Sequence, residues 1–429
     1  MKVIRDAVHG DIELAPNEMR LIHTAGFQRL HGCRQLGLTH LVYPSAKHSR
    51  FEHVLGVMHV ATKMSDCLRR QRKLPKIAAK ARTADHSKET ALFFQGARGQ
   101  RLRTILRLSA LLHDMGHVPF GHTLEDEMPI ISKHDRPSGR MESEVSQLLE
   151  QSGNQGFREE VLQTLQAISA SDDDEVVYKL VDDGKIRHDL LVLADIIGNT
   201  ICADLLDYIK RDHMMTGVRA TYDNRILRYF AVGKHTYKGK SYDRVLIGLV
   251  RHGRVRGDCL ADLLDLLKLR YNLSDKVLFH PKKCAASAML IRAVHELGLT
   301  ESDLMATSDE ALLENHRKHP LIDMIRKRQL FKPVHISRLE HITSYHERLN
   351  KKELLAELRR DYVLRRRIEE AVEKNLKLRH HTVLIYCPKP DMTLKPVRVL
   401  VQWKDGTTRR LNELEKDDDP LTFEQVSVL

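Results

Sequence analysis

The sequence predicts a mostly α-helical protein with a small β-containing lobe at its C-terminal end. Hydrophobic residues make up 42% of the 429 positions but aromatic residues only 5%, which favours a helical interior built of Leu, Ile and Ala over a β sandwich. Helical spacing of apolar residues recurs from Asn17 to about residue 380. After that point "HTVLIYCP" and "VRVLVQW" read as strands, and Asp405-Gly406 is typical of a hairpin turn.

The first 70 residues predict a short hairpin followed by helices. Residues 1–15 alternate apolar and polar, with His9-Gly10 as the turn, which favours two short strands. Helical periodicity follows from Asn17 to about residue 70. It is interrupted at Val42–Arg50, where Pro44 forbids a continuous helix.

The middle of the chain predicts further helices separated by polar loops. Residues 71–100 are basic and polar without a clear period, so we expect a long loop there. Residues 101–114 have helical spacing, which Gly116 and Pro119 end. Other expected segments are a loop at 132–140, one buried helical segment at 189–212, and one charged amphipathic helix at 350–374.

Two domains are expected, with the boundary placed where the helical core gives way to the last helix and the strands. The first covers residues 1–345 and the second covers residues 346–429.

Charge and cysteine usage restrict the class of protein. The six cysteines are scattered and no C-x-x-C occurs, which argues against a disulfide framework and a zinc knuckle.

No apolar run approaches the roughly 18 residues of a membrane helix. The start "MKVIRDAVHGDIEL" lacks an apolar signal region, so we expect a cytoplasmic protein without membrane contact. The net charge of +12 indicates anionic partners such as nucleotides, nucleic acid or acidic surfaces, without choosing among them.

Histidine and aspartate occur in three apolar settings that suit a metal ion. His113-Asp114 ends an apolar helical segment, and His53 stands near the start of another. Asp204 lies in an apolar run where an unpaired carboxylate is costly. Two imidazoles and two carboxylates bind borderline and hard divalent cations, here Mn, Fe, Mg, Co, Ni or Zn. A single His-Asp pair also arises by chance, and a lone core histidine is more often a packing residue.

A polar stripe supports the metal interpretation. Residues 204, 207, 208, 211 and 212 fall at helical spacing, so their side chains share one helix face; they are Asp204, Asp207, Tyr208, Arg211 and Asp212. A salt-bridged helix face is the simpler explanation, but it does not account for the apolar flanks. The stripe therefore indicates a helix that lines a site.

The motifs R-F-E-H-x-L-G, H-D-x-G-H-x-P-F-x-H and D-x-x-D-Y-x-x-R-D occur in this order. Together with "IRDAVHGDIEL" and "VYPSAKHSRFEHVLGV", they resemble the HD-domain metal-dependent phosphohydrolases. Within these, the chain resembles the deoxynucleoside triphosphate triphosphohydrolases, which include bacterial dGTPases and the vertebrate antiviral dNTP hydrolase. The resemblance covers roughly residues 1–290. It implies an HD-domain helical core, a homo-oligomer, and hydrolysis of dNTPs to deoxynucleoside and inorganic triphosphate.

The resemblance also implies roles for individual residues. One divalent ion would be held by His53, His113, Asp114 and Asp204. Acid/base chemistry would come from His122, with Glu125 orienting it, and from two further active-site histidines, His117 and His134. Substrate contacts would be Arg50 for phosphate, Gln35, Tyr208 and Asp212 for deoxyribose, and Arg270 facing the nucleotide.

Three positions depart from the vertebrate-type branch. Leu205 stands where that branch has a phosphate-binding lysine. His23 and His31 stand where it reads an activating guanine nucleotide. A neutral imidazole cannot accept two N–H groups as a carboxylate does, so a requirement for GTP is not expected. Another nucleotide or single-stranded nucleic acid could bind as a regulator instead.

Two alternatives stay open from the sequence. An HD-type 5′-nucleotidase or phosphodiesterase would use the same ligands and differ in its product. A nucleic-acid-binding regulator is supported by the net charge and by the basic segments at 68–82 and 358–370. A solvated helix face is the simpler explanation of both segments.

Overall fold

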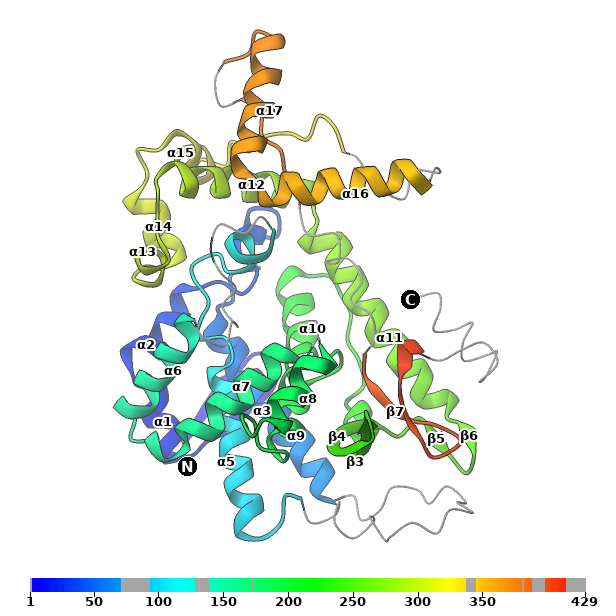
Figure 1. Cartoon of the computed structure of the whole chain (residues 1–429). Helices are drawn as coiled ribbons and strands as arrows, with labels where there is room; N and C mark the ends of the chain where they lie inside the picture. Colours follow the sequence, from blue (N-terminus) through cyan, green and yellow to red (C-terminus); the bar gives the residue numbers. More distant parts are fainter. Residues whose placement is uncertain are drawn as a thin grey trace.

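A computed structural model describes residues 2–70, 93–127, 131, 139–171, 173–336, 345–379, 382–387 and 398–413. Helices build most of the molecule, and short strands lie beside them (Figure 1), which confirms the mostly α fold class. Across these described ranges, no helix is both long and apolar enough to cross a membrane.

The chain begins with the predicted hairpin. Strands β1 (Lys2–Asp6) and β2 (Gly10–Leu14) pair antiparallel, with Asp6 opposite Gly10. The Asp6 carboxylate accepts the His9 amide at 2.8 Å, and Gly10 takes a left-handed φ of 76°. The hairpin therefore carries Asp6 and His9 on a short, defined turn.

The following helices confirm the predicted break before residue 50. Short elements lead to a long helix, in the order α1 (Pro16–Ile22), α2 (Ala25–Gln28), two 3₁₀ turns (Arg29–Gly32 and Gly37–Leu41) and α3 (Arg50–Arg70). Pro44 lies between the second turn and α3. One side of α3 is apolar and fully buried, with Val54, Val57, Met58, Ala61 and Met64 in the core.

Helix α3 packs against α5 (Gly96–Leu112) and α10 (Ala203–Thr216), and α7 (Arg158–Ala170) and α9 (Leu190–Ile197) complete this core. The expectation of one helical segment over 189–212 is wrong, because residues 198–202 separate α9 from α10. The Cβ of any larger residue at Gly198 would overlap the Ile168 side chain, so the break allows a close approach to α7.

Two predicted loops are only partly visible. Most of the expected 71–100 loop lies outside the described residues. The prediction of a loop is wrong for its last five residues, because they are helical: α5 begins at Gly96. The 132–140 loop also lies largely outside the described residues. Helix α6 begins at its last position and runs over Arg140–Gln151.

A second group of helices packs beside the first (Figure 1). It comprises α12 (Pro281–Glu296), α13 (Glu301–Met305), α14 (Asp309–Asn315) and α15 (Pro320–Arg326), which share a hydrophobic cluster of their own. Further helical elements are α8 (Asp174–Asp182), α11 (Gly257–Leu273), and single turns at Thr123–Glu127, Gln155–Phe157, Asn224–Arg228, Ser274–Leu278 and Leu411–Glu413.

The small β-containing C-terminal region is confirmed, but half of its sheet comes from the middle of the chain. The strand order is β3 (Phe230–Tyr237), β4 (Lys240–Ile247), β7 (Leu400–Gln402) and β8 (Thr408–Arg410), with β4 and β7 parallel. Helices were expected at 230–247, so that expectation is wrong; a further hairpin, β5 (Val250–Arg251) and β6 (Arg254–Val255), follows. The predicted turn at Asp405-Gly406 is confirmed between β7 and β8.

The "HTVLIYCP" segment does not form the expected strand in its described residues, 382–387. Its backbone amides instead donate to two carboxylates of helix α17 (Tyr362–Asn375). The Val383 amide donates to Glu373, and the Ile385 amide donates to Glu369. The expected single helix at 350–374 is also wrong. Helix α16 (Tyr345–Arg360) ends before Asp361, whose carboxylate caps α17. A domain boundary at residue 345 stays a prediction.

Candidate functional site

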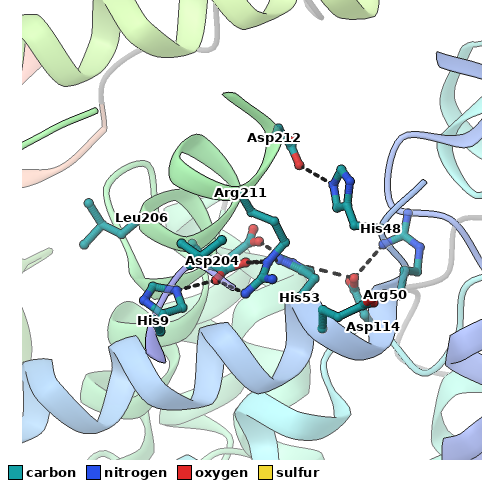
Figure 2. Close-up of polar contacts among 12 residues, drawn as sticks. His9, His48, Arg50, His53, Asp114, Asp204, Leu206, Arg211 and Asp212 are labelled. Carbon is teal, nitrogen blue, oxygen red and sulfur yellow. Dashed lines mark hydrogen bonds and ion pairs between the residues drawn. The ribbon is translucent and has the colours of Figure 1, made fainter. Parts of the chain in front are cut away.

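The candidate site lies where three helix ends meet. The N-terminal end of α3 supplies Arg50 and His53, and the C-terminal end of α5 runs into His113 and Asp114. The first turn of α10 supplies Asp204. Figure 2 shows His53, Asp114 and Asp204 converging from segments that are far apart in sequence.

Three of the four predicted ligands form a compact cluster. One ligand atom from each of His53, His113 and Asp114 lies within 4.8 Å of the other two. Asp204 joins this cluster, because its Oδ1 is 3.0 Å from His53 Nε2 and 4.0 Å from His113 Nε2. The structure therefore brings together all four residues that the sequence singled out.

The donor atoms fit a divalent cation. His113 Nδ1 lies 2.9 Å from the Ala110 carbonyl, which fixes the tautomer with the proton on Nδ1. Its Nε2 is buried without a hydrogen-bond partner in the described part of the chain and lies 3.5 Å from Asp114 Oδ1. A buried imidazole lone pair facing carboxylates is an arrangement that a metal ion satisfies.

A buried ion-pair network stands behind His53. Asp207 Oδ2 lies 2.8 Å from His53 Nδ1, and the same carboxylate accepts Arg211 Nε at 2.9 Å. His9 Nε2 contacts it at 2.6 Å, and Arg211 reaches on to Asp6 at 2.8 Å. Burial alone would raise the pKa of Asp207, but Arg211 and the hydrogen bonds from His53 and His9 together hold that pKa well below its usual range. Asp207 is therefore a charged anchor that orients the His53 ring.

Sequence analysis placed Asp207 and Arg211 on the polar stripe but did not give them this role. It missed Asp6 and His9, which the N-terminal hairpin brings to the network. Their presence in "RDAVHGD" was the available signal.

Close packing of α3 on α10 makes the network possible. A Cβ at Gly56 would overlap the Asp207 carboxylate and the Arg211 guanidinium. Because only a hydrogen fits at this position, glycine is required by the approach of the two helices and not by backbone conformation.

Arg50 lies beside the ligand cluster with unused donors. Its side chain is 1% exposed, and Nη1 donates to Asp114 Oδ2 at 2.5 Å. Its Nε and Nη2 are buried and make no hydrogen bond within the described ranges. Burial would raise the pKa of Asp114, but Arg50 and the neighbouring imidazoles hold it well below its usual range. Arg50 thus has two N–H-bearing nitrogen atoms without a partner in the described part of the chain, next to the candidate metal centre.

The loop after α5 carries the predicted acid/base residues. The Glu125 carboxylate, expected to orient His122, lies 3.2 Å from His117 Nδ1 and accepts Arg140 Nη2 at 3.0 Å. The exposed His122 ring packs edge-on against His117, with ring centroids 4.8 Å apart. His134 lies outside the described residues.

Two of the predicted sugar contacts, Gln35 and Asp212, bind His48, a histidine that was not predicted from the sequence. His48 Nε2 lies 2.8 Å from Asp212 Oδ1, and both residues are buried. The Gln35 backbone amide donates to the His48 carbonyl at 3.0 Å. The side-chain Oε1 of Gln35 is buried without a hydrogen-bond partner among the described residues. Burial raises the pKa of Tyr208, and the charge of Arg270 opposes that rise, which places Arg270 near the phenol.

The three positions that differ from the vertebrate-type branch have ordinary surroundings. Leu205 is buried in α10 beside Asp204. His23 is exposed at the end of α1, and the exposed His31 stacks on Phe51 with ring centroids 3.7 Å apart.

Comparisons with known proteins agree with the fold and the cluster. The family model described as the HD domain matches residues 50–212, a range that includes all four predicted ligands. HD domains bind divalent metals, and the His53, His113 and Asp114 cluster within residues 50–212 could hold such an ion.

Three relatives place the chain more closely. It is 32% identical over 340 residues to an uncharacterized protein of Methanocaldococcus jannaschii, covering 77% of this chain and 59% of the relative. It is 26% identical over 360 residues to the deoxynucleoside triphosphate triphosphohydrolase SAMHD1 homolog of Dictyostelium discoideum, covering 78% and 60%. Against deoxynucleoside triphosphate triphosphohydrolase SAMHD1 of Gallus gallus, identity is 38% over 125 residues, covering 29% and 17%.

The chain spans about three fifths of the length of the first two relatives. Residues 50–212 belong to the HD-domain family, and the chain is similar to proteins named as deoxynucleoside triphosphate triphosphohydrolases.

Proposed function

We propose that this protein hydrolyses deoxynucleoside triphosphates to a deoxynucleoside and inorganic triphosphate. The observation that carries the proposal is the position of Arg50: its Nε and Nη2 have no hydrogen-bond partner among the described residues, and the side chain adjoins the His53, His113 and Asp114 cluster. An anion at Arg50 would lie against a bound cation, as a nucleotide phosphate requires. The relatives named as triphosphohydrolases support the choice of substrate.

The chain's own residues can supply most of the chemistry. A divalent metal held by His53, His113, Asp114 and Asp204 would lower the pKa of a water molecule and neutralise phosphate charge. Arg50 would donate to phosphate oxygens and stabilise negative charge as it develops. The departing 5′ oxygen needs a proton, and His122 at the exposed end of the loop is the candidate donor.

The proposed sugar contacts explain a preference for deoxynucleotides. Gln35, Tyr208 and Asp212 would face the deoxyribose, and His48 would fix the Asp212 carboxylate through their 2.8 Å contact. Packing of the Tyr208 ring on the sugar would leave no room for a 2′-hydroxyl. We therefore expect dNTPs to be hydrolysed faster than the matching NTPs.

The test is product analysis with the metal-loaded protein and each of the four dNTPs and matching NTPs. Triphosphate and deoxynucleoside are the expected products, and an Asp204→Asn preparation serves as the control for contaminating activity. Release of single phosphates, or cleavage of phosphodiesters, would favour a nucleotidase or phosphodiesterase instead. Equal rates with dNTPs and NTPs would contradict the sugar contacts.

A nucleic-acid-binding regulator receives less support from the structure. In the basic segment 358–370, Arg365 is buried and donates to the Arg359 carbonyl at 2.7 Å. Arg366 pairs with Glu370 at 2.8 Å, so part of this charge is used internally. Most of the other segment, 68–82, lies outside the described residues. A steep salt dependence of DNA or RNA affinity would favour this alternative.

We also propose that the protein forms a homo-oligomer and that it is located in the cytoplasm.

A further inference from the structure

The motif loop after α5 is anchored by helices that lie outside the HD-domain match. Val118, Phe120 and Leu124 belong to the second hydrophobic cluster, which they share with side chains of α12, α14 and α15. The main cluster contains the buried faces of α3, α5 and α10. The loop that carries His117 and His122 therefore depends on packing against residues 286–325.

One carboxylate ties this second group of helices to the site. Asp309, the first residue of α14, is 1% exposed. Its Oδ1 accepts the Phe120 amide at 2.8 Å, and its Oδ2 accepts the Arg34 amide at 3.1 Å. Phe120 has a φ of 60°, a conformation that a non-glycine residue adopts only when its surroundings enforce it.

The first of these amides belongs to the turn that faces Arg50. Gly121 follows Phe120 with a φ of 35°. A Cβ at Gly121 would lie 2.6 Å from Arg50 Nη2 and 3.2 Å from His117 Nδ1. The backbone of this turn thus forms a wall of the space around Arg50, and the Phe120 amide sets its position.

The second amide belongs to the segment on which Arg50 itself rests. Arg34 forms an antiparallel bridge with Ser49, and the Arg50 amide donates to the Cys33 carbonyl at 2.8 Å. The neighbouring Gln35 amide donates to the His48 carbonyl. Displacement of residues 33–35 would therefore move Arg50 and His48 together.

Two further contacts hold the start of α14 on the same segment. A Cβ at Gly32 would overlap the side chain of Ser308, the residue that caps α14. Glu310 forms an ion pair with the Arg34 guanidinium. The close approach at Gly32 and the two acidic residues thus place α14 against residues 32–34.

We propose that Asp309 is a positioning residue for the phosphate-binding site: its carboxylate fixes the turn at Phe120–Gly121 and the segment 33–35 relative to each other, and so fixes the space in which Arg50 meets phosphate. The inference rests on the proposed function in that Arg50 is taken to bind the substrate's phosphates. Asp309 lies outside residues 50–212, which the HD-domain family model matches.

Burying the Asp309 carboxylate is energetically unfavourable, which indicates that the residue has a specific structural role here. Burial raises its pKa to about 6, and the hydrogen bonds from Phe120 and Arg34 only partly offset that effect. A buried carboxylate that binds two amides from separate segments joins them more strongly than a neutral side chain would.

The first test compares Asp309→Asn with Asp323→Asn, a matched change at a half-buried carboxylate of α15 that pairs with Lys327. An asparagine oxygen accepts one amide, but its NH₂ group faces the other. In the metal-loaded full-length protein, we expect Asp309→Asn to keep its metal content while its affinity for inorganic tripolyphosphate falls by about tenfold or more. Asp323→Asn should match the unmodified protein in both measurements.

Calorimetric binding of tripolyphosphate separates this inference from the proposed function, because it needs no dNTP hydrolysis. If hydrolysis occurs, the pH profile and the kcat and KM of Asp309→Asn should change while metal content does not. Unchanged tripolyphosphate affinity in folded Asp309→Asn would overturn the proposal.

A second pair of variants decides the matter if Asp309→Asn does not fold. Gly32→Ala should push the start of α14 away without touching the carboxylate, and so weaken tripolyphosphate binding. Adding Ser308→Gly removes the overlapping side chain and should restore the affinity, since glycine is nearly as good a helix cap as serine. Gly32→Ala with full affinity, or a double variant without recovery, would count against Asp309 as a positioning residue.

Discussion

At the scale of single residues, the ionisation of two buried carboxylates at the candidate site and the tautomer of His113 each depend on specific neighbours. Asp114 stays ionised beside Arg50, and Asp207 stays ionised beside Arg211, although both are buried. His113 directs Nε2 toward the cluster because Nδ1 is engaged by the Ala110 carbonyl. The site is thus prepared for a cation by its surroundings and not only by its ligand types.

We predict that Asp114→Ala and Asp204→Ala each abolish metal binding and hydrolysis while the fold persists. Each change removes a carboxylate from a set of four ligands, which leaves too few donors for tight binding. Metal content of the purified variants, with circular dichroism as a check of folding, measures this. Asp212→Asn is the control, because Asp212 contacts His48 and not the ligand cluster. Full metal occupancy in either alanine variant would show that the ligands are different.

His122→Ala should keep metal and nucleotide affinity but lose most turnover. Loss of a general acid/base group typically costs ~100- to 10,000-fold in rate, because the leaving oxygen lacks its proton. Single-turnover hydrolysis of a dNTP measures the chemical step. His252→Ala, at an exposed loop position, serves as the control. A rate within a few-fold of the unmodified protein would remove His122 from this role.

At the scale of elements, the site depends on how closely α3 and α10 approach. We predict that Gly56→Ala destabilises the fold by roughly 1–3 kcal/mol, the usual cost of overpacking. The added methyl group would displace Asp207 and Arg211, so metal affinity should fall as well. Urea unfolding and metal titration measure the two effects. Gly257→Ala at the start of α11 has open space around it and should be neutral.

Local sequence patterns predicted those elements whose reasons are local. The β1–β2 hairpin, α3 and the polar face of α10 follow from alternation, spacing and turn residues. The hairpin β3–β4 was missed because its buried half is a continuous apolar run that also suits a helix. The break between α9 and α10 was missed because its reason is the distant side chain of Ile168.

The same distinction applies to the site. Motifs named the four predicted ligands, which the structure brings together. They could not reveal His9, which reaches Asp207 from 198 residues away, or Asp309, which reaches Phe120 from 189 residues away. Such contacts depend on the tertiary fold: the motif "IRDAVHGDIEL" contains His9 but does not show its partner, and Asp309 lies in none of the quoted motifs.

At the scale of the whole molecule, two hydrophobic clusters meet at the motif loop. One contains the helices that carry the candidate metal ligands, and the other contains Val118 and Phe120 on the opposite side of the loop. Arg29 adds a further connection, because its guanidinium donates to the Met115 and His117 carbonyls. Any ligand or partner that shifts the second group of helices would therefore act on the loop.

Regulation by guanine nucleotide is the feature in which we expect this protein to differ from the vertebrate-type enzymes. His23 is exposed and His31 is stacked on Phe51, so neither presents a carboxylate or guanidinium to a guanine base. We predict that dNTP hydrolysis proceeds without GTP, and that any homo-oligomer is constitutive or depends on another anionic ligand. Hydrolysis rates with and without GTP, with molar mass from light scattering in both states, measure this. Activity and oligomerisation that both appear only with GTP would contradict the prediction and assign His23 and His31 to an activator site.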